Sequence, residues 1–278
     1  MTRTHRLLSR WLPGLLALLL LPYAAGLAWL WFRQERLLFQ PEPWPAQPPE
    51  AMAAPDVQSA WVDVPGARLH ALHLKQAGAK GLVFFLHGNG GNLASWFVNT
   101  DFYRRAGFDL FMLDYRGYGQ SGGQIESEAQ LMADVRAAWQ QVSPQYAGRP
   151  VVVYGRSLGT GLAAQLALEV EPTLTVLVSP YRSMEALARE RFPWVPTAVL
   201  RYPLRTEQIV SRLPGPLWLV HGERDTLIPP AHSRVLRDQA GLRATLLLLP
   251  EAGHGDVHRF PAYLDGLQAE LARLAPPT

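Results

Sequence analysis

One serine of the chain stands where a nucleophile could be exposed. Ser157 follows a β-branched run that stops at Gly155, and Gly159 and an apolar, helix-like stretch come after it. The pattern predicts a strand, a sharp turn and a helix, with Ser157 at the apex of the turn. Glycine is needed on both sides because a side chain there would collide with the neighbouring element. The turn also sets the backbone N–H of Leu158 at a helix start, where it can face developing negative charge.

A serine hydroxyl becomes an effective nucleophile only when a neighbouring base takes its proton. His254 suits that task because it stands between two glycines in a loop after the last apolar run. Asp225 follows an earlier apolar run and could hold the histidine in the correct tautomer. We therefore predict Ser157 as nucleophile, His254 as base and Asp225 as acid. A plain glycine-rich turn between strand and helix is the alternative explanation of the pattern around Ser157, and these partners disfavour it.

The elements that must position these residues are indicated by apolar runs. Two alternating segments, 57–64 and 69–75, predict an antiparallel hairpin at a sheet edge, with Pro65-Gly66 near the turn. Continuous apolar runs follow at 82–86, 110–113, 151–154, 174–178, 217–220 and 245–249. Such runs, alternating with helical segments, predict an α/β fold with a mainly parallel sheet of eight strands flanked by helices. Ligands of such sheets bind beyond the carboxyl ends of the strands.

The segments that follow these runs are rich in glycine and in ionisable residues. They are His87-Gly88-Asn89-Gly90-Gly91-Asn92, Asp114-Tyr115-Arg116-Gly117-Tyr118-Gly119, Gly155-Arg156-Ser157-Leu158-Gly159-Thr160, Ser179-Pro180-Tyr181, His221-Gly222-Glu223-Arg224-Asp225 and Gly253-His254. On these motifs, from about residue 36 to about residue 271, the chain resembles serine hydrolases of the α/β-hydrolase fold. More narrowly, it resembles the membrane-anchored, small-lid group that includes the Bem46-like proteins and the mammalian alpha/beta hydrolase domain-containing proteins 12, 13 and 17.

The resemblance implies a Ser-His-Asp catalytic triad of Ser157, His254 and Asp225 that acts through an acyl-enzyme. Two other carboxylates compete for the place of the acid. By the pattern of the family, Glu223 stands two residues too early. Asp256 is so close to His254 in the sequence that an awkward turn would be needed.

An oxyanion hole needs two backbone N–H groups, one after the nucleophile and one from the loop after an early strand. The first is that of Leu158. The resemblance implies Asn89 as the second, with Gly90 as the alternative. His87 and His221 also end strands and are expected to be structural. The sequence shows no cluster of metal-ligating residues, and no cofactor is expected.

Residues 181–214 stand where this fold inserts its lid. The segment is too short for a large helical cap and combines apolar with basic residues, among them Phe192, Trp194, Arg189, Arg191, Arg201 and Arg205. A rim of this kind over Ser157 would suit an acyl chain whose head group is neutral or anionic. Ordinary packing of a helix and a loop explains the segment equally well.

The N-terminal region has the pattern of a membrane anchor. Residues 1–10 carry three arginines, and residues 11–32 contain no charged residue. As a helix, these 22 residues would span roughly 33 Å, enough for the hydrocarbon core of a bilayer. Gly26-Leu27-Ala28 could instead be a signal-peptide cleavage site, but the apolar run continues past it, which favours a retained, single-pass transmembrane helix. The slight excess of arginine before the span favours a catalytic domain on the extracytoplasmic side.

Residues 33–56 are predicted to link this helix to the domain. Six prolines between positions 41 and 55 predict an extended, semi-rigid spacer. The hydrolase domain is expected to comprise residues 57–278.

The composition excludes several classes of function. The chain has no cysteine, which excludes disulfides, thiol nucleophiles and cysteine-based metal sites. Its net charge is +3, and nearly all the cations are arginines that are scattered along the sequence. No nucleic-acid-binding face is therefore predicted.

These features predict a membrane-anchored serine hydrolase that cleaves acyl esters or thioesters, such as lysophospholipids, monoacylglycerols or acylated proteins. A serine peptidase or aminopeptidase of the same fold is the second hypothesis. The short, basic lid disfavours it, because aminopeptidases on this fold usually need a larger cap and acidic groups for the amine. A non-catalytic, membrane-anchored protein of this fold is the third, and the presence of Ser157, Asp225 and His254 together argues against it.

Overall fold

The computed structural model describes the backbone of residues 3–274 and the side chains of residues 17–274. Eight strands form one sheet in the order β1-β2-β4-β3-β5-β6-β7-β8. The strands are β1 (Val57–Val64), β2 (Ala67–Leu74), β3 (Gly81–Leu86), β4 (Phe108–Leu113), β5 (Val151–Arg156), β6 (Leu174–Val178), β7 (Leu217–Gly222) and β8 (Ala244–Leu249).

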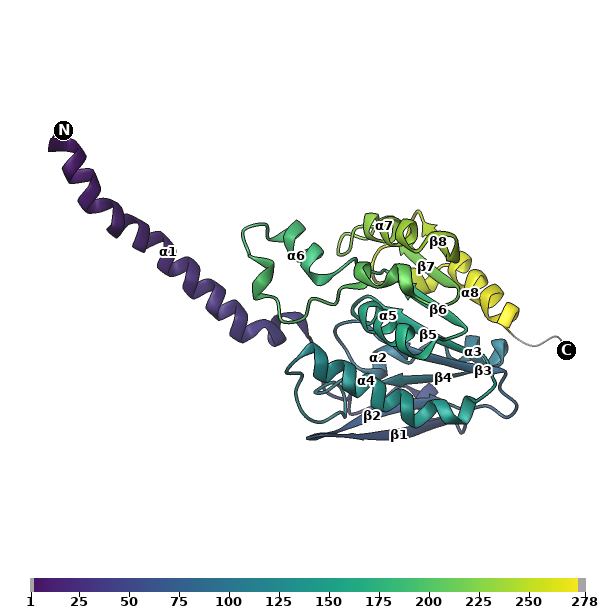
Figure 1. Ribbon diagram of the computed structural model, residues 1–278. Coiled ribbons are helices and arrows are strands. Elements are labelled where there is room, and N and C mark those ends of the chain that lie inside the picture. The colour runs from purple at the N-terminus through teal and green to yellow at the C-terminus, as the bar shows by residue number, and fades with distance from the viewer. Residues whose placement is uncertain (1–2, 275–278) are drawn as a thin grey trace.

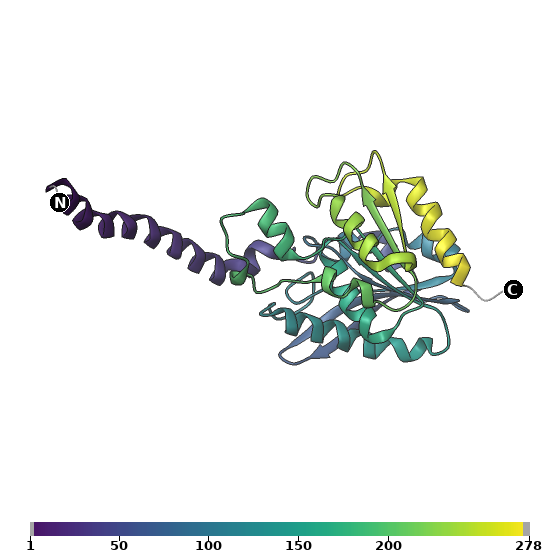
Figure 2. The ribbon, with the colours of Figure 1, turned by 45° about the horizontal axis from the view of Figure 1, so that its top comes forward.

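Helices flank the sheet on both faces (Figures 1 and 2). The α-helices are α1 (Arg3–Leu38), α2 (Leu93–Trp96), α3 (Thr100–Ala106), α4 (Glu128–Val142), α5 (Leu158–Val170), α6 (Met184–Arg191), α7 (Ala231–Ala240) and α8 (Pro261–Leu274). The short 3₁₀ helices are η1 (Glu50–Ala53), η2 (Ser143–Tyr146), η3 (Thr197–Val199), η4 (Thr206–Gln208), η5 (Val210–Arg212), η6 (Gly241–Arg243) and η7 (Val257–Arg259).

The strand pairing confirms the mainly parallel sheet predicted from the apolar runs. β1 and β2 form the antiparallel hairpin, with Pro65 and Gly66 at the turn, and β2 pairs antiparallel with β4. The remaining neighbours, from β4 and β3 through to β8, are parallel. β5 lies between β3 and β6, so the strand that leads to Ser157 is held on both edges.

The core has two layers, one on each face of the sheet. Val153 of β5 packs in the cluster that contains Leu162 of α5 and Leu131 of α4. Its neighbour Tyr154 packs in the opposite cluster, with Leu267 of α8. Successive residues of a strand point to opposite faces, so a central strand covered on both faces must be apolar throughout. This explains why the strands appear in the sequence as continuous apolar runs.

Helix α1 projects away from the domain at the N-terminal end of the chain (Figure 1). It is a single helix of 36 residues that includes the segment 11–32 predicted as a transmembrane anchor. Within the part of the chain that the structure describes, no helix combines the length and the hydropathy needed to cross a membrane. The side chains of the predicted basic segment 1–10 lie outside the described residues.

The end of α1 packs against the predicted lid, which contains α6, η3, η4 and η5. The side-chain amide of Gln34 donates to the carbonyl oxygen of Val199 at 2.8 Å and accepts from the N–H of Arg201 at 2.7 Å. Tyr23 donates to the carbonyl oxygen of Trp194 at 2.7 Å. The lid is therefore bonded to α1 as well as to the domain.

Residues 40–43, which we call the strap, lie on the domain surface. Pro41 and Pro43 form isolated parallel bridges with Gly91 and Gly119. The N–H of Glu42 donates to the carbonyl oxygen of Gly91 at 3.1 Å. Of the predicted linker 33–56, residues 33–38 belong to α1 and residues 50–53 to η1. The strap does not form a free spacer, because its backbone polar groups pair with loops of the domain.

Candidate active site

Ser157 occupies a sharp turn between β5 and α5. Its φ of 50° and ψ of −119° are strained values for a residue with a side chain. A Cβ on Gly155 would lie 2.5 Å from the carbonyl oxygen of Gly159, and a Cβ on Gly159 would overlap the carbonyl oxygen of Leu86. The two glycines are therefore required by close packing of strand against helix, as the sequence pattern predicts.

The predicted base and acid lie in line with this serine. The hydroxyl of Ser157 lies 2.9 Å from Nε2 of His254. Nδ1 of His254 lies 2.7 Å from Oδ2 of Asp225. Ser157 and Asp225 are buried, whereas the His254 side chain is 24% exposed. In this arrangement Asp225 can accept from Nδ1–H and leave Nε2 free to take the serine proton.

Asp225 is anchored on the side away from His254 as well. Its Oδ1 accepts from the N–H groups of Leu227 at 2.9 Å and Ile228 at 2.8 Å. Burial opposes ionisation, but hydrogen bonds from His221, His254 and Ile228 outweigh it, so the pKa of Asp225 lies below its ordinary value. The carboxylate is therefore ionised at neutral pH and can orient and stabilise a protonated His254.

The sequence predicts a structural role for His221, but its side chain contacts the carboxylate of Asp225 directly. Its imidazole is fully buried, and Nε2 lies 3.2 Å from Oδ2 of Asp225 and 2.8 Å from the carbonyl oxygen of Ile228. Nδ1 lies 2.6 Å from the hydroxyl of Ser233, which can donate to it. The available signal was that His221, near the end of β7, stands four residues before Asp225.

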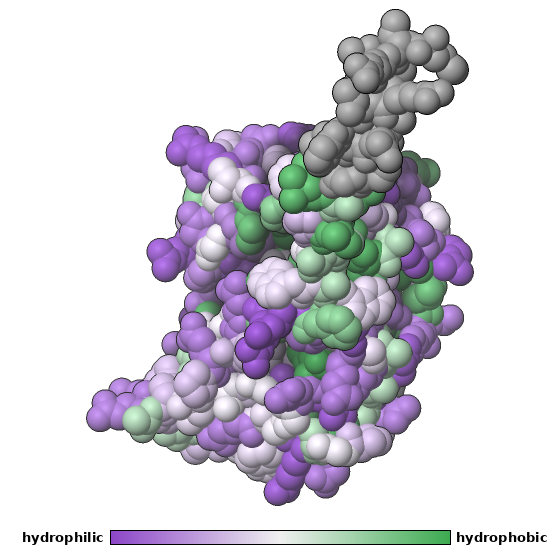
Figure 3. Space-filling view, turned by 90° about the vertical axis from the view of Figure 1, so that its left-hand side faces the viewer, coloured by the Kyte–Doolittle hydropathy of each residue, from purple (hydrophilic) through white to green (hydrophobic). Residues whose placement is uncertain are grey.

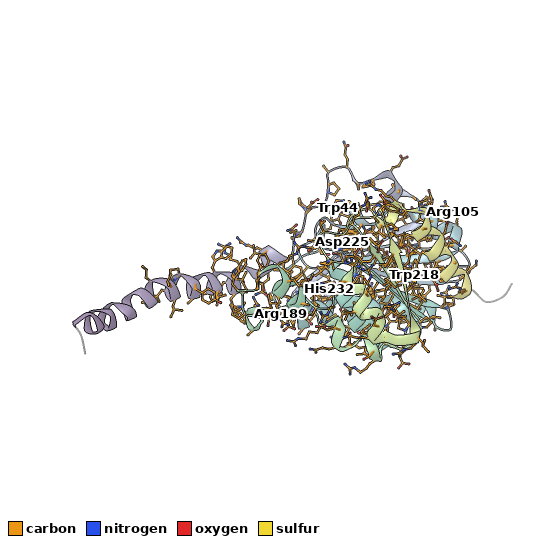
Figure 4. The ribbon with its side chains drawn as sticks, turned by 90° about the horizontal axis from the view of Figure 1, so that it is seen from above. Trp44, Arg105, Arg189, Trp218, Asp225 and His232 are labelled. Atoms are coloured by element: carbon orange, nitrogen blue, oxygen red, sulfur yellow. The ribbon has the colours of Figure 1, made fainter. Side chains whose placement is uncertain are left out.

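The competing carboxylates are engaged elsewhere. Glu223 pairs with Arg234 at 2.8 Å on the surface. Oδ1 of Asp256 accepts from the N–H of Gly253 at 2.8 Å. Of the carboxylates considered for the acid, the one that contacts the His254 side chain is Asp225. Figure 4 shows Asp225 within the body of the domain, whereas Arg189 of the lid helix lies on the side that α1 joins.

The loop after β3 lies directly beside the nucleophile. A Cβ on Gly88 would lie 3.3 Å from Cβ of Ser157. The next residue, Asn89, uses its side-chain oxygen to accept from Gly90, from Tyr118 and from Gln40 of the strap. Among residues 3–274 the N–H of Asn89 has no acceptor. Leu158 is the first residue of α5, so its N–H has no acceptor within the helix.

His87 is placed as a structural residue. It is fully buried, and its Nδ1 lies 2.7 Å from the carbonyl oxygen of Gly88. Its Nε2 lies 3.4 Å from Asp114, whose Oδ1 also accepts from the N–H of Leu93. His87 therefore braces the base of the loop and does not contact Ser157 Oγ.

Arg156 is a residue of the site that the sequence reasoning missed. Its guanidinium is buried and donates to the carbonyl oxygens of His254 at 3.3 Å and Gly255 at 2.9 Å. It also lies 3.1 Å from Nδ1 of His258. Arg156 therefore ties the loop that carries His254 to the strand that carries Ser157. Its place between Gly155 and Ser157 was the signal available.

An open cavity of about 1010 Å³ adjoins His254 and Asn89. Its wall combines polar residues with aromatic and aliphatic ones, among them Phe85, Trp96, Met112, Tyr154 and Leu227. Arg156, His258 and Arg259 line the same cavity, and Glu42 is its one carboxylate among the described residues. A cavity with these walls can hold an apolar group next to His254.

Comparisons with known proteins identify the family of the chain. Residues 77–206 match the family described as "Serine aminopeptidase, S33". Alpha/beta hydrolase domain-containing protein 17B of Xenopus laevis is 31% identical over 200 residues, which cover 70% of this chain and 67% of the relative. The human protein of that name is 31% identical over 195 residues, covering 68% of this chain and 66% of the relative. The chain thus spans about two thirds of the length of these relatives.

Solved structures share the fold at low identity. An esterase of Pyrococcus furiosus superposes with a TM-score of 0.70 at 18% identity, covering 86% of this chain and 98% of the esterase. An acylaminoacyl peptidase of Pyrococcus horikoshii superposes with a TM-score of 0.62 at 13% identity, covering 80% of this chain and 42% of the peptidase. Sheet order, elbow and sequence similarity lead to one conclusion: the chain belongs to the α/β-hydrolase family, in the group related to alpha/beta hydrolase domain-containing protein 17.

Proposed function

We propose that this protein is a serine hydrolase that cleaves acyl esters or thioesters through an acyl-enzyme. The observation that carries the proposal is the continuous hydrogen-bonded line from Ser157 through His254 to Asp225 at the end of β5. Hydrolases with this arrangement attack an acyl carbonyl with the serine while the histidine takes its proton.

The proposed reaction uses these groups in turn. His254 takes the proton of Ser157 as its oxygen attacks the carbonyl carbon, and Asp225 stabilises the resulting imidazolium. The N–H groups of Asn89 and Leu158 bind the negatively charged oxygen of the tetrahedral intermediate. His254 then protonates the leaving alcohol or thiol. Water, activated by the same histidine, hydrolyses the acyl-enzyme and restores the serine.

The cavity favours an acyl substrate over a free amine. Its aromatic and aliphatic lining suits an acyl chain, and its charged residues are mostly basic. A peptidase remains the second candidate, because the matched family is described as a serine aminopeptidase. An aminopeptidase needs acidic groups to hold the ammonium group of its substrate. Within residues 17–274 the cavity is lined by a single carboxylate, that of Glu42, which disfavours this candidate.

We further propose that α1 and the lid face a membrane. Apolar side chains are exposed along α1 at residues 18–21, at Trp29 and at Phe32, and on the lid at Phe192 and Trp194. Figure 3 shows hydrophobic surface next to the grey atoms, on the side from which α1 projects. A contiguous exposed apolar surface with aromatic residues is typical of contact with a membrane interface. An extracytoplasmic position of the domain stays a prediction.

The test is a hydrolysis screen of the full-length, detergent-solubilised protein against matched esters, thioesters and aminoacyl amides. We expect medium and long acyl esters or thioesters to be cleaved faster than amides. Ser157→Ala serves as the control and should hydrolyse none of them. A clear preference for amides would transfer the assignment to a peptidase, and wild-type protein inactive on all three classes would defeat the enzyme proposal.

A further inference from the structure

The loop that carries Asn89 is held by a segment distant in sequence. The strap pairs with this loop at two points: the N–H of Gln40 donates to Oδ1 of Asn89 at 2.9 Å, and the N–H of Glu42 donates to the carbonyl oxygen of Gly91 at 3.1 Å. From the other side, the side-chain N–H₂ of Asn92 donates to the carbonyl oxygens of Glu42 at 3.1 Å and Pro43 at 2.9 Å. The strap therefore donates hydrogen bonds to the loop and also accepts hydrogen bonds from it.

The side chain of Asn89 is the centre of this contact. Its Oδ1 accepts from Gln40 N–H at 2.9 Å, from Gly90 N–H at 2.9 Å and from the hydroxyl of Tyr118 at 3.0 Å. Gly90 and Gly91 have φ values of 76° and 73°, and glycine adopts such values without steric strain. A loop with two such glycines has intrinsic conformational freedom, so the contacts of Asn89 have to fix its orientation.

The geometry points to the strap as a positioning element of the oxyanion hole. We propose that Gln40 N–H, together with the Tyr118 hydroxyl, locks the Asn89 side chain and thereby keeps the Asn89 N–H directed at the substrate carbonyl oxygen. The inference rests on the proposed function, because it assigns a task within the same reaction. It also makes the predicted spacer a part of the catalytic domain.

The strap and the residues just before it connect the lid to the loop that carries Asn89. The strap follows directly after α1, and Gln34 in the last turns of α1 is hydrogen bonded to both Val199 and Arg201 of the lid. Phe39, just before the strap, is buried and packs edge to face on Tyr202 at 5.0 Å between ring centroids. The lid and the loop that carries Asn89 are thus both bonded to residues 34–43.

The experiment removes one N–H. Gln40→Pro deletes the donor to Asn89, and the following Pro41 already restricts residue 40 to the extended backbone that proline can adopt. Gln40→Ala changes the side chain but keeps the N–H. Glu50→Pro is a matched control for added proline, because Glu50 is the first residue of η1 and its N–H has no acceptor within residues 3–274.

Three quantities are measured on the full-length protein with the best ester from the screen: kcat, KM and the Ki of a trifluoromethyl ketone with the same acyl chain. The oxygen of Ser157 adds to the carbonyl carbon of such a ketone, and the ketone oxygen becomes an oxyanion, so the Ki reports on the oxyanion hole. We expect kcat of Gln40→Pro to lie about tenfold below that of Gln40→Ala, with similar KM, because one orienting hydrogen bond is lost. The Ki should rise by the same factor, and Glu50→Pro should match the wild type.

The outcomes separate the two proposals. A folded Gln40→Pro with the kcat and Ki of Gln40→Ala overturns the role of the strap, as does a lower kcat with unchanged Ki. If Gln40→Pro loses its cooperative melting transition, Tyr118→Phe decides, because it deletes the second donor to Asn89: a parallel change of kcat and Ki supports the proposal, and no change overturns it. A wild-type protein without activity would refute both the proposed function and the role of the strap.

Discussion

The two sides of the candidate site are held by different means. Ser157 comes directly after β5, which pairs with β3 and β6. Asp225 comes three residues after β7, in a turn whose own N–H groups, those of Leu227 and Ile228, hold its carboxylate. Asn89 stands in a glycine-containing loop that is bonded to the strap, 49 residues earlier in the chain. A sheet supplies its own frame for residues at its strand ends, whereas a loop of this kind needs a frame from elsewhere. Substitutions on the two sides should therefore have different consequences.

The largest expected effect is on the side that carries Ser157 and Asp225. Asp225→Asn keeps the shape of the residue but removes the charge that fixes the tautomer of His254, so we expect kcat to fall by about 10⁴-fold. Steady-state kinetics on the best ester would measure it. Turnover within tenfold of the wild type would mean that another carboxylate serves as the acid, and Glu223→Gln and Asp256→Asn would identify it.

A second test addresses the close packing around Gly159, at the turn between β5 and α5. Gly159→Ala places a methyl group against the backbone carbonyl oxygens of Leu86 and His87, and backbone atoms cannot easily move away. Overpacking of this kind costs about 3 kcal/mol, which lowers the melting temperature by about 10 °C in a domain of this size. Gly255→Ala is the matched control, because its added Cβ would meet nothing within 4 Å. Equal melting temperatures for both variants would show that the elbow is less tightly packed than described.

The link between Ser157 and the His254 loop should give a smaller effect. Arg156→Gln removes the donors to the carbonyl oxygens of His254 and Gly255, so we expect kcat to fall by about tenfold while the fold persists. Arg136→Gln, which breaks a surface pair with Glu169, is the control and should leave kcat unchanged. If Arg156→Gln behaved like this control, the His254 loop would not depend on Arg156.

The smallest effect concerns acid stability. Because the pKa of Asp225 is lower in the folded than in the unfolded chain, its carboxylate stabilises the fold above the unfolded pKa of about 3.9. That contribution is lost as the pH falls through the folded pKa. We therefore expect the excess of the wild-type melting temperature over that of Asp225→Asn to shrink below about pH 4. A constant difference between pH 3 and pH 7 would show that the ionised form is not favoured by folding.

Sequence patterns were sufficient for the sheet and the elbow because local rules govern them. Runs buried on both faces specify central strands, and glycines around Ser157 specify a turn whose close contacts the structure displays. The chain order of Ser157, Asp225 and His254 then placed three candidates at strand ends of one sheet. Each of these inferences needs only the residues within one element and the general layout of a parallel sheet.

The contacts that the sequence could not predict join residues far apart in the chain. Arg156 bonds to the carbonyl oxygen of His254, 98 residues away, and Gln40 bonds to Asn89 across 49 residues. The prolines between residues 41 and 55 predict a spacer, yet no composition rule tells whether such a segment is free or docked. The docked state depends on the carbonyl and N–H groups that loops at Gly91 and Gly119 present.

The central claim is that Ser157 is the nucleophile of a serine hydrolase, and covalent labelling tests it most directly. The full-length protein is incubated with a fluorophosphonate, digested and analysed by mass spectrometry. We predict a single phosphonylated serine, Ser157, with no labelling of Ser157→Ala and slow labelling of Asp225→Asn. Labelling that is absent from the wild type, or that persists undiminished in Ser157→Ala, would contradict the account.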